Sequence, residues 1–310
     1  MKHELIIGFI TFGKLTEKYL PSFLSSLNKQ TFKDFKILVF DNTDDGNAGN
    51  AEYIKNNFSS IEILSEGRNI GFAKAYNKMI KRAVEMGVKY FLTINPDMIL
   101  EPDAIEKMIK TLDDDERLGS VSPKILKWDF LNNKKTNIID TCGIKLKSGL
   151  RFIDIGQGEN DKNQFNNIDI LGPSGACGMY RIDVLKNNVF DELMFMYKED
   201  CDLAYRLNLA GYKSKCVSDS VVYHDRTAQA KGESNFKIAL NRKNKSKQVK
   251  KWSFLNQQII FLKYWKSQNF KNKIAIIIYE LKIIIFIILF EQYLLKEFIK
   301  LWRMRKKIKI

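Results

Sequence analysis

The 310-residue sequence has few of the residues on which disulfide-bonded and metal-clustered small proteins depend. It contains four cysteines and two histidines, and none of the cysteines stands in a Cys-x-x-Cys or Cys/His metal-binding spacing. This argues against a disulfide framework or a structural zinc site and is typical of free thiols in a reducing compartment. The first residues also show no small-residue cleavage site of a signal peptide, so we expect a cytoplasmic protein.

Long uncharged apolar runs are missing as well. The most apolar segment, residues 274–290, is interrupted by Glu280 and Lys282, whereas a membrane-spanning helix needs about 20 mostly apolar residues. The Lys, Arg, Trp and Tyr residues around this segment favour instead a helix that lies in a membrane interface. A helical pair that packs on the rest of the chain or on another subunit is the alternative interpretation.

Acidic residues are scarce in the C-terminal quarter. Residues 231–310 contain 20 Lys and Arg residues but only four Glu residues, so the first 230 residues are almost neutral and the net charge of +15 comes from the end of the chain. We therefore divide the chain into a body, 1–230, and a basic helical region, 231–310. This asymmetry predicts a polyanionic partner such as nucleic acid, anionic lipid or a phosphorylated substrate; a solvated lysine-rich surface is the alternative.

Strand and helix patterns alternate through the first 112 residues, which predicts a mostly parallel, doubly wound α/β sheet. After residue 119, short β-like runs with Gly and Asn predict a small antiparallel extension, and the small residues 172–176 are expected to precede a helix. The expected strands cover residues 4–12, 35–42, 61–64 and 89–95, and the expected helices cover residues 16–30, 51–58, 71–86 and 101–112.

Polar side chains stand where three of the expected strands end. They are Thr11 after the first strand, Asp41 and Asn42 after the second, and Asn95 and Asp97 after the fourth. The carboxyl ends of parallel strands meet at one edge of a sheet, where α/β proteins bind their ligands. Each carboxylate alone could equally be a turn residue or a helix cap.

A pair of carboxylates, Glu199 and Asp200, opens an expected helix directly after the aromatic run MFMY. Apolar surroundings can raise the basicity of a carboxylate, which suits a general base. Stabilisation by the helix dipole is the structural alternative, and it also covers Asp202. His224 ends a later strand and is either a packed side chain or a ligand.

Several motifs follow one another in a specific order. They are IIGFITFGK, ILVFDNTDDG, GRNIGFAKAYNKMI, the tripeptide NPD, and a block that begins GACGMYRIDVL and ends VVYH. In this order the chain resembles family-2 inverting glycosyltransferases of the GT-A fold, most like the rhamnosyltransferase-type subgroup. The resemblance covers roughly residues 4–230, and the ordered set is far more specific than any one tripeptide.

The resemblance implies a nucleotide-sugar donor, dTDP- or UDP-linked, and a divalent cation, Mn2+ or Mg2+. Asp200 is implied as the general base, with Glu199 orienting the base or the acceptor, and Asp97 and His224 as metal ligands. The implied donor-binding residues are Thr11, Asp41, Asn42, Asn69, Gly71, Phe72, Asn77 and Asn95. The implied acceptor-side residues are Gly175, Ala176 and Asp202.

Two positions depart from the family pattern. Asn95 stands where most relatives carry the first Asp of an Asp-x-Asp motif, and Gly13 stands where a polar Asn is usual. With these reservations we expect transfer of rhamnose or a hexose to a hydroxyl of a lipid-linked or cell-surface glycan. The basic region would hold the protein at the anionic inner face of the cell membrane. A homo-oligomer is compatible with the C-terminal helices, and no nucleic-acid partner is expected.

Two other functions compete with this interpretation. Basic and aromatic residues interleave between residues 241 and 273, which would suit an inactive transferase-like protein that binds nucleic acid or a lipid surface. The segment Gln248-Val-Lys-Lys-Trp252 loosely resembles the Gln-x-x-Arg-Trp motif of processive polysaccharide synthases. Lys cannot replace the bidentate contacts of Arg, and the several membrane spans of those enzymes are missing.

Overall fold

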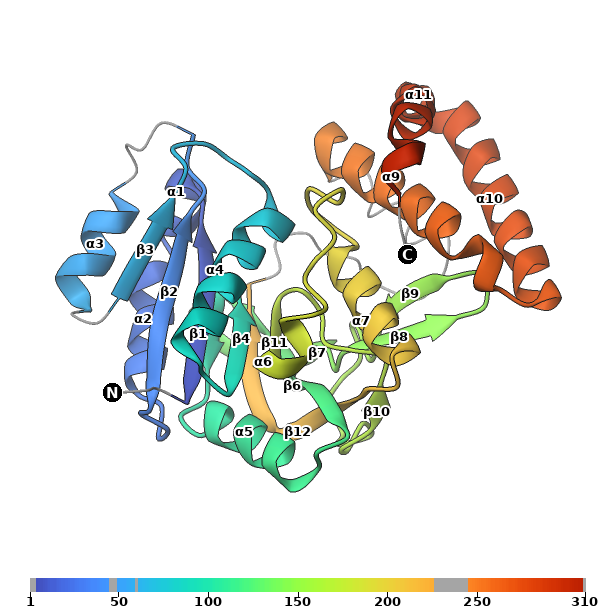
Figure 1. Ribbon diagram of the computed structural model, residues 1–310. Coiled ribbons are helices and arrows are strands. Elements are labelled where there is room, and N and C mark those ends of the chain that lie inside the picture. The colour runs from blue at the N-terminus through green and yellow to red at the C-terminus, as the bar shows by residue number, and fades with distance from the viewer. Residues whose placement is uncertain (1–3, 45–48, 59–60, 226–244, 309–310) are drawn as a thin grey trace.

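The computed structural model describes residues 4–44, 49–58, 61–225 and 245–308 (Figure 1). The expected boundary near residue 230 and the first residues of the basic run 241–252 lie outside these ranges. The described chain forms one ten-stranded sheet, a separate two-stranded hairpin and helices that flank the sheet.

The strands fall into two groups and the helices into two regions of the chain. The main sheet contains β1 (Leu5–Thr11), β2 (Phe35–Asp41), β3 (Ile61–Ser65), β4 (Tyr90–Ile94), β5 (Met98–Leu100), β6 (Leu118–Asp129), β7 (Lys134–Thr141), β10 (Asp169–Ile170), β11 (Cys177–Arg181) and β12 (Lys213–His224), and the hairpin contains β8 (Ile144–Lys147) and β9 (Arg151–Asp154). The helices of the body are α1 (Gly13–Glu17), α2 (Leu20–Asn28), α3 (Asn50–Asn57), α4 (Phe72–Met86), α5 (Ala104–Asp114), α6 (Ile182–Leu185) and α7 (Glu199–Leu209). The C-terminal helices are α9 (Lys247–Tyr264), α10 (Phe270–Phe290) and α11 (Leu295–Met304), with the 3-10 turns η1 (Trp265–Ser267), η2 (Gln292–Leu294) and η3 (Arg305–Lys307).

The N-terminal half of the sheet is parallel, as predicted. Its strands lie in the order β4, β1, β2, β3, and Thr11 pairs with Asp41 in the register of β1 and β2. The carboxyl ends of these strands therefore meet at one edge, where the polar side chains were expected. The helix expected over residues 16–30 is divided into α1 and α2, and Pro21 stands in the first turn of α2, the helical position that tolerates proline.

The rest of the sheet is mixed and includes the predicted antiparallel extension. The long strand β6 pairs with β7 and β11 in antiparallel fashion and with β12 in parallel. The short strand β5, which the sequence did not indicate, pairs with the end of β12, so that His224 lies opposite Met98. The tripeptide NPD is therefore the turn between β4 and β5.

The helix expected after residues 172–176 is the short α6, and a strand that the sequence did not indicate comes before it. Residues 177–181 form β11, an antiparallel strand between β4 and β6. Cys177 and Met179 pack into the core on one side of the sheet, while Tyr180 packs into the core on the other side. A short strand that is buried on both faces has no polar-apolar alternation, so its sequence carries no strand signal.

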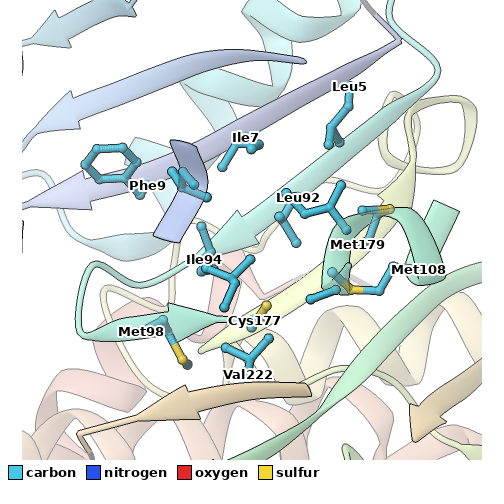
Figure 2. Close-up of a cluster of buried hydrophobic side chains, with 14 of the residues drawn as sticks. Leu5, Ile7, Phe9, Leu92, Ile94, Met98, Met108, Cys177, Met179 and Val222 are labelled. Carbon is cyan, nitrogen blue, oxygen red and sulfur yellow. The ribbon is translucent and has the colours of Figure 1, made fainter. Parts of the chain in front are cut away.

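Two cores cover the two faces of the sheet. One joins the strands to α2 and α5, and it includes Met108 of α5 together with Leu5, Ile7 and Leu92 (Figure 2). The other packs α4, α6 and part of α7 against the opposite face. In both helices α4 and α5 the buried residues recur at helical spacing, which fixes the face that each helix turns to the sheet.

The C-terminal helices lie beside α7 and the hairpin, away from α3 and β3 (Figure 1). A third core joins Leu255, Ile259 and Tyr264 of α9 to Phe152 of β9 and Tyr205 of α7. Packing of these helices on the body, one of the two sequence interpretations, is therefore what the structure shows. Among the helices of the described ranges, none is both long enough and apolar enough to cross a membrane.

Gly8 offers a direct test of the packing at the centre of the sheet. A Cβ atom at this position would lie 2.5 Å from Cζ of Phe91, whose side chain is fully buried. We expect Gly8→Ala to lower the free energy of unfolding by about 1–3 kcal/mol, because a buried ring on a central strand cannot move aside without strain.

The matched control is Gly49→Ala, since an added Cβ at Gly49 meets no atom within 4 Å of the described structure and its φ is −59°. Denaturant unfolding of both variants measures the difference. An equal loss in the two variants would contradict the packing around Phe91.

Candidate active site

The first cluster lies where β1 and β2 end. Oδ1 of Asp41 accepts hydrogen bonds from the hydroxyls of Thr11 (3.1 Å) and Thr43 (2.6 Å). The Thr43 hydroxyl also accepts the Gly13 N–H at 3.0 Å. Thr43 was missed by sequence reasoning, although its place two residues after an aspartate is a common turn position. These bonds fix the carboxylate of Asp41 at the sheet edge while the residue keeps 6% exposure.

Asn42, Asn69 and Gly71 together shape the loop that leads into α4. Oδ1 of Asn42 accepts the Ile70 N–H at 2.8 Å, and Oδ1 of Asn69 accepts the Gly71 N–H at 2.9 Å. Gly71 has a φ of 86°, and a Cβ atom there would lie 2.6 Å from the carbonyl oxygen of Phe195. Only glycine satisfies both conditions. The two asparagines thus hold this loop in shape.

Phe72 and Asn77 join α4 to the segment before α7. The Phe72 N–H donates to the Phe195 carbonyl at 2.8 Å. The amide of Asn77 is buried, and it donates to the Phe190 carbonyl and accepts the Phe190 N–H, both at 2.9 Å. Asn77 is therefore used to clamp the backbone at Phe190, which ties α4 to the segment before α7.

Asp97 and His224 lie together, as predicted. Nε2 of His224 is 3.3 Å from Oδ2 of Asp97, and Nδ1 is 2.8 Å from Oδ2 of the buried Asp140, a residue that sequence reasoning missed. Burial alone would lower the pKa of the imidazole, but the charges of Asp97 and Asp140 outweigh it and raise the pKa of His224 to about 10. The Asp140 bond also fixes the ring so that Nε2 faces Asp97.

A divalent cation fits this corner. Oδ1 of Asp97 is buried, and no donor among the described residues bonds to it. A buried carboxylate oxygen without a partner is costly unless a cation completes it, and hard oxygen ligands suit Mg2+ while the imidazole is a better ligand for Mn2+. Within the described ranges no group of three or more Asp, Glu, His or Cys side chains is arranged so that it could hold a metal ion by itself. Asp97 and His224 would leave the remaining positions to the donor diphosphate and water.

The carboxylates Glu199 and Asp200 open α7, as predicted. Oδ2 of the half-buried Asp200 accepts the Gly175 N–H at 2.8 Å. Glu199 is only 4% exposed, and Oε2 of its carboxyl has no hydrogen-bond partner in the described chain. Burial raises the pKa of Glu199 well above its ordinary value, and the charge of Asp200 adds to the rise. The two neighbouring carboxylates thus have different environments.

Gly175 and Ala176 connect the two corners. The Ala176 carbonyl accepts the Asn95 N–H at 2.9 Å, while the adjacent Gly175 amide holds Asp200. The Asn95 backbone is thereby placed two hydrogen bonds away from the carboxylate of Asp200. The segment before β11 is the physical link between the NPD turn and the start of α7.

Asp202 has a different setting from Asp200, although it is in the same helical turn. It is fully buried; Oδ2 pairs with Nε of Arg206 at 2.8 Å, and Oδ1 pairs with Nζ of Lys263 at 2.9 Å. The Tyr264 hydroxyl donates to the same Oδ1 at 2.6 Å. The structure thus places Asp202 inside the packing between α7 and α9, apart from the expected acceptor-side residues Gly175 and Ala176.

Comparison with solved structures identifies the fold. The crystal structure of GalNAc-T7 with UDP, GalNAc and Mn2+ superimposes with a TM-score of 0.57 at 13% sequence identity, over 83% of this chain and 51% of that one. This is the GT-A type of mixed α/β fold that the sequence predicted. At this sequence identity the likeness establishes the fold.

Comparison with sequence families is more specific. The model of Glycosyl transferase family 2 matches residues 7–188, more than half of the chain, so the protein belongs to this family. The match ends before α7. The N-acetylglucosaminyl-diphospho-decaprenol L-rhamnosyltransferase of Mycobacterium tuberculosis is 25% identical over 229 residues, 67% of this chain and 72% of that protein. Rhamnosyltransferase WbbL of Escherichia coli is 25% identical over 209 residues, 64% of this chain and 75% of WbbL.

The buried Glu199 predicts an unusual pH dependence of stability. Since its pKa is raised in the folded state, folding costs free energy above the ordinary pKa of a glutamate, and this cost is absent in more acidic solution. We expect Glu199→Gln to raise the unfolding midpoint at about pH 8 and to change it little near pH 4.

Thermal unfolding at several pH values measures this effect. Glu52→Gln, which changes an exposed glutamate of α3, is the control and should gain no stability at either pH. A loss of stability in Glu199→Gln at high pH would show that the charged carboxylate has a stabilising partner.

Proposed function

We propose that this protein is a metal-dependent inverting glycosyltransferase that moves a sugar from a nucleotide-diphosphate donor to an acceptor hydroxyl. The observation that carries the proposal is the pair of carboxylates at one rim: Asp97, with its unpartnered buried oxygen, and Asp200, held by the Gly175 amide. Family membership supports the reaction class. Asp97 would hold the cation that stabilises the leaving group, and Asp200 would remove the proton of the acceptor hydroxyl.

Asp97 and the neutral imidazole of His224 would hold the divalent cation on the leaving-group side, and binding of the cation would release the proton that His224 otherwise carries. When bound, the cation neutralises charge that develops on the diphosphate. Asp140 keeps the His224 ring oriented for this task through its bond to Nδ1. Thr11 and Asp41 would bind the nucleotide at the adjacent strand ends, and Asn95 offers a neutral amide beside the diphosphate.

Asp200 would act on the other side of the sugar. Its carboxylate takes the proton of the acceptor hydroxyl while the hydroxyl oxygen forms a bond to the anomeric carbon. The bond from that carbon to the diphosphate oxygen breaks in the same step, so the configuration inverts. The proton ends on Asp200, and the electron pair leaves with the nucleoside diphosphate. Glu199 would orient Asp200 or the acceptor.

The relatives favour one kind of donor and acceptor. Two of them are rhamnosyltransferases by name, and the Mycobacterium tuberculosis enzyme is named for a lipid-linked acceptor with a diphosphate group. We therefore propose transfer of rhamnose from a dTDP-linked donor to a lipid-linked or cell-surface glycan. A UDP-linked hexose is the second donor to be tested in the same assay.

The decisive experiment compares two variants with the wild type. Asp200→Asn should abolish transfer, a loss of at least about 1000-fold, and leave donor binding nearly intact, because the base acts only after the donor is bound. Asp97→Ala should lose both transfer and the dependence of donor binding on Mn2+ or Mg2+.

Transfer is measured with a panel of nucleotide sugars, and donor binding by thermal shift with and without Mn2+. Loss of donor binding in Asp200→Asn would assign that residue a structural role instead. Tight nucleic-acid binding at physiological salt, with no effect of metal or donor, would favour the inactive binding protein.

We also propose that the C-terminal region, residues 231–310, is a unit distinct from the body. This region would hold the enzyme at the anionic inner face of the cell membrane. Large apolar side chains of α10 and α11 are exposed and are accompanied by exposed basic residues such as Lys282 and Arg303. Interfacial helices show this combination, and each basic residue near an anionic surface contributes about 1 kcal/mol. The exposed apolar residues are Phe270, Ile274, Ile277, Ile278, Leu281, Ile285, Ile288, Leu289, Phe290, Leu295, Ile299 and Trp302.

Sedimentation with vesicles tests the membrane proposal. The full chain should bind vesicles that contain phosphatidylglycerol more tightly than vesicles of phosphatidylcholine, and salt should weaken the binding. The double variant Ile285→Ser/Phe290→Ser should lose most of it, whereas Leu131→Ser, which changes a 99% exposed leucine between β6 and β7, should not. A stable dimer in light scattering without vesicle binding would show that a second copy covers this face.

A further inference from the structure

Helix α9 contacts the segment that leads into Asp200, although both lie beyond the residues that the family model matches. The ring of Trp252 stacks on Phe195 with centroids 4.9 Å apart, and Asn256 reaches the next two residues along the chain. Further along α9, Lys263 pairs with Asp202. Helix α9 therefore contacts the chain both before and after Glu199 and Asp200.

The central contact is the amide of Asn256, which is 1% exposed. Its Nδ2 donates to the carbonyl of Met196 at 2.9 Å and to the carbonyl of Tyr197 at 2.6 Å. A buried amide that satisfies two consecutive carbonyls fixes the orientation of the peptide units between them.

The clamped backbone has an unfavourable conformation. Tyr197 and Lys198 have φ values of 71° and 72°, in the left-handed region that side chains with a Cβ atom rarely adopt. Such residues persist only where the surrounding structure holds them, and they gather at functional sites. This pair sets the direction in which α7 begins, because the Lys198 carbonyl accepts the N–H of Asp202 as the first bond of the helix.

We propose that Asn256 is a positioning residue for the transfer reaction. By holding the carbonyls of Met196 and Tyr197, it keeps the left-handed pair in place and so aims the carboxylate of Asp200 at the acceptor. The inference rests on the proposed role of Asp200 as general base. Asn256 itself touches no reacting atom.

The neighbouring residue Gln257 provides a matched control. Its amide is also buried, at 6% exposure, and its Nε2 donates at 3.2 Å to the carbonyl of Leu150, another left-handed residue with a φ of 51°. Leu150 lies in the turn between β8 and β9, outside the segment 195–198 that leads into Asp200. Each amide thus holds a segment with left-handed residues, Asn256 through two carbonyls and Gln257 through one.

The experiment compares Asn256→Leu with Gln257→Leu in the full chain. Both variants should lower the unfolding midpoint, Asn256→Leu more than Gln257→Leu, because the first removes the donor of two buried carbonyls and the second the donor of one. Only Asn256→Leu should lower kcat, by about 10- to 100-fold, with KM for the donor within about twofold, because a small displacement of a catalytic group is costly while the donor site is unchanged. Hydrogen exchange should become faster at residues 196–202 in Asn256→Leu alone.

Three outcomes would overturn the inference. They are normal kcat in Asn256→Leu, an equal fall of kcat in both variants, and unchanged hydrogen exchange at residues 196–202 in Asn256→Leu. The proposed role of Asp200 as general base fails separately: it is refuted if Asp200→Asn transfers sugar as well as the wild type, and the proposed function itself is refuted if the wild type transfers no sugar from any donor of the panel. The hydrogen-exchange comparison needs no activity, so it decides on the clamp in either case.

Discussion

The position of β11 between β4 and β6 is the constraint on which the candidate site depends. The antiparallel register pairs Cys177 with Ile94, so the residues just before β11 must lie beside the residues just after β4. Ala176 then bonds to Asn95, and Gly175 is left to bond to Asp200. A Cβ atom at Gly175 would lie in ordinary van der Waals contact with the Asp200 side chain, at 3.4 Å, which shows how closely the two residues approach.

This register also separates two kinds of buried carboxylate. On the side of the NPD turn, Asp97 and Asp140 share the imidazole of His224, which can carry a positive charge between them. At the start of α7, Glu199 and Asp200 are adjacent, and Asp200 accepts hydrogen bonds from the backbone amides of Gly175 and Cys201. In the proposed reaction Asp97 would serve the leaving-group side, and Asp200 would remove the proton of the acceptor.

Local patterns in the sequence predicted the parts of the site that lie at strand ends. Thr11, Asp41 and Asn95 follow buried apolar runs, and Glu199 and Asp200 open a helix, so periodicity and turn chemistry locate them. Asp140 and Asn256 could not be found this way, because their partners are distant in the sequence; Asp140 bonds to His224, 84 residues further along the chain. A polar residue that acts through one long-range hydrogen bond leaves no local signal in the sequence.

A related limit applies to Asn77 and Asp202, which stand in conspicuous motifs. Their side chains bond to Phe190 and to the cations Arg206 and Lys263, respectively. A motif cannot distinguish contact with a ligand from contact with the chain that holds the ligand site, whereas burial and hydrogen-bond partners can.

The C-terminal helices differ in what their apolar side chains contact. Helix α9 shares a core with β9 and α7, so these two elements of the body depend on α9 for packing. Helix α10 contributes only Ile276 and Ile287 as fully buried side chains and leaves most of its apolar residues exposed. Because Gln258 of α9 donates to Glu280 of α10 at 2.9 Å, the two helices are tied by a polar contact as well as by packing. Anything that binds the exposed face of α10 therefore acts on a helix that is fastened to α9, and α9 in turn holds the residues before Asp200.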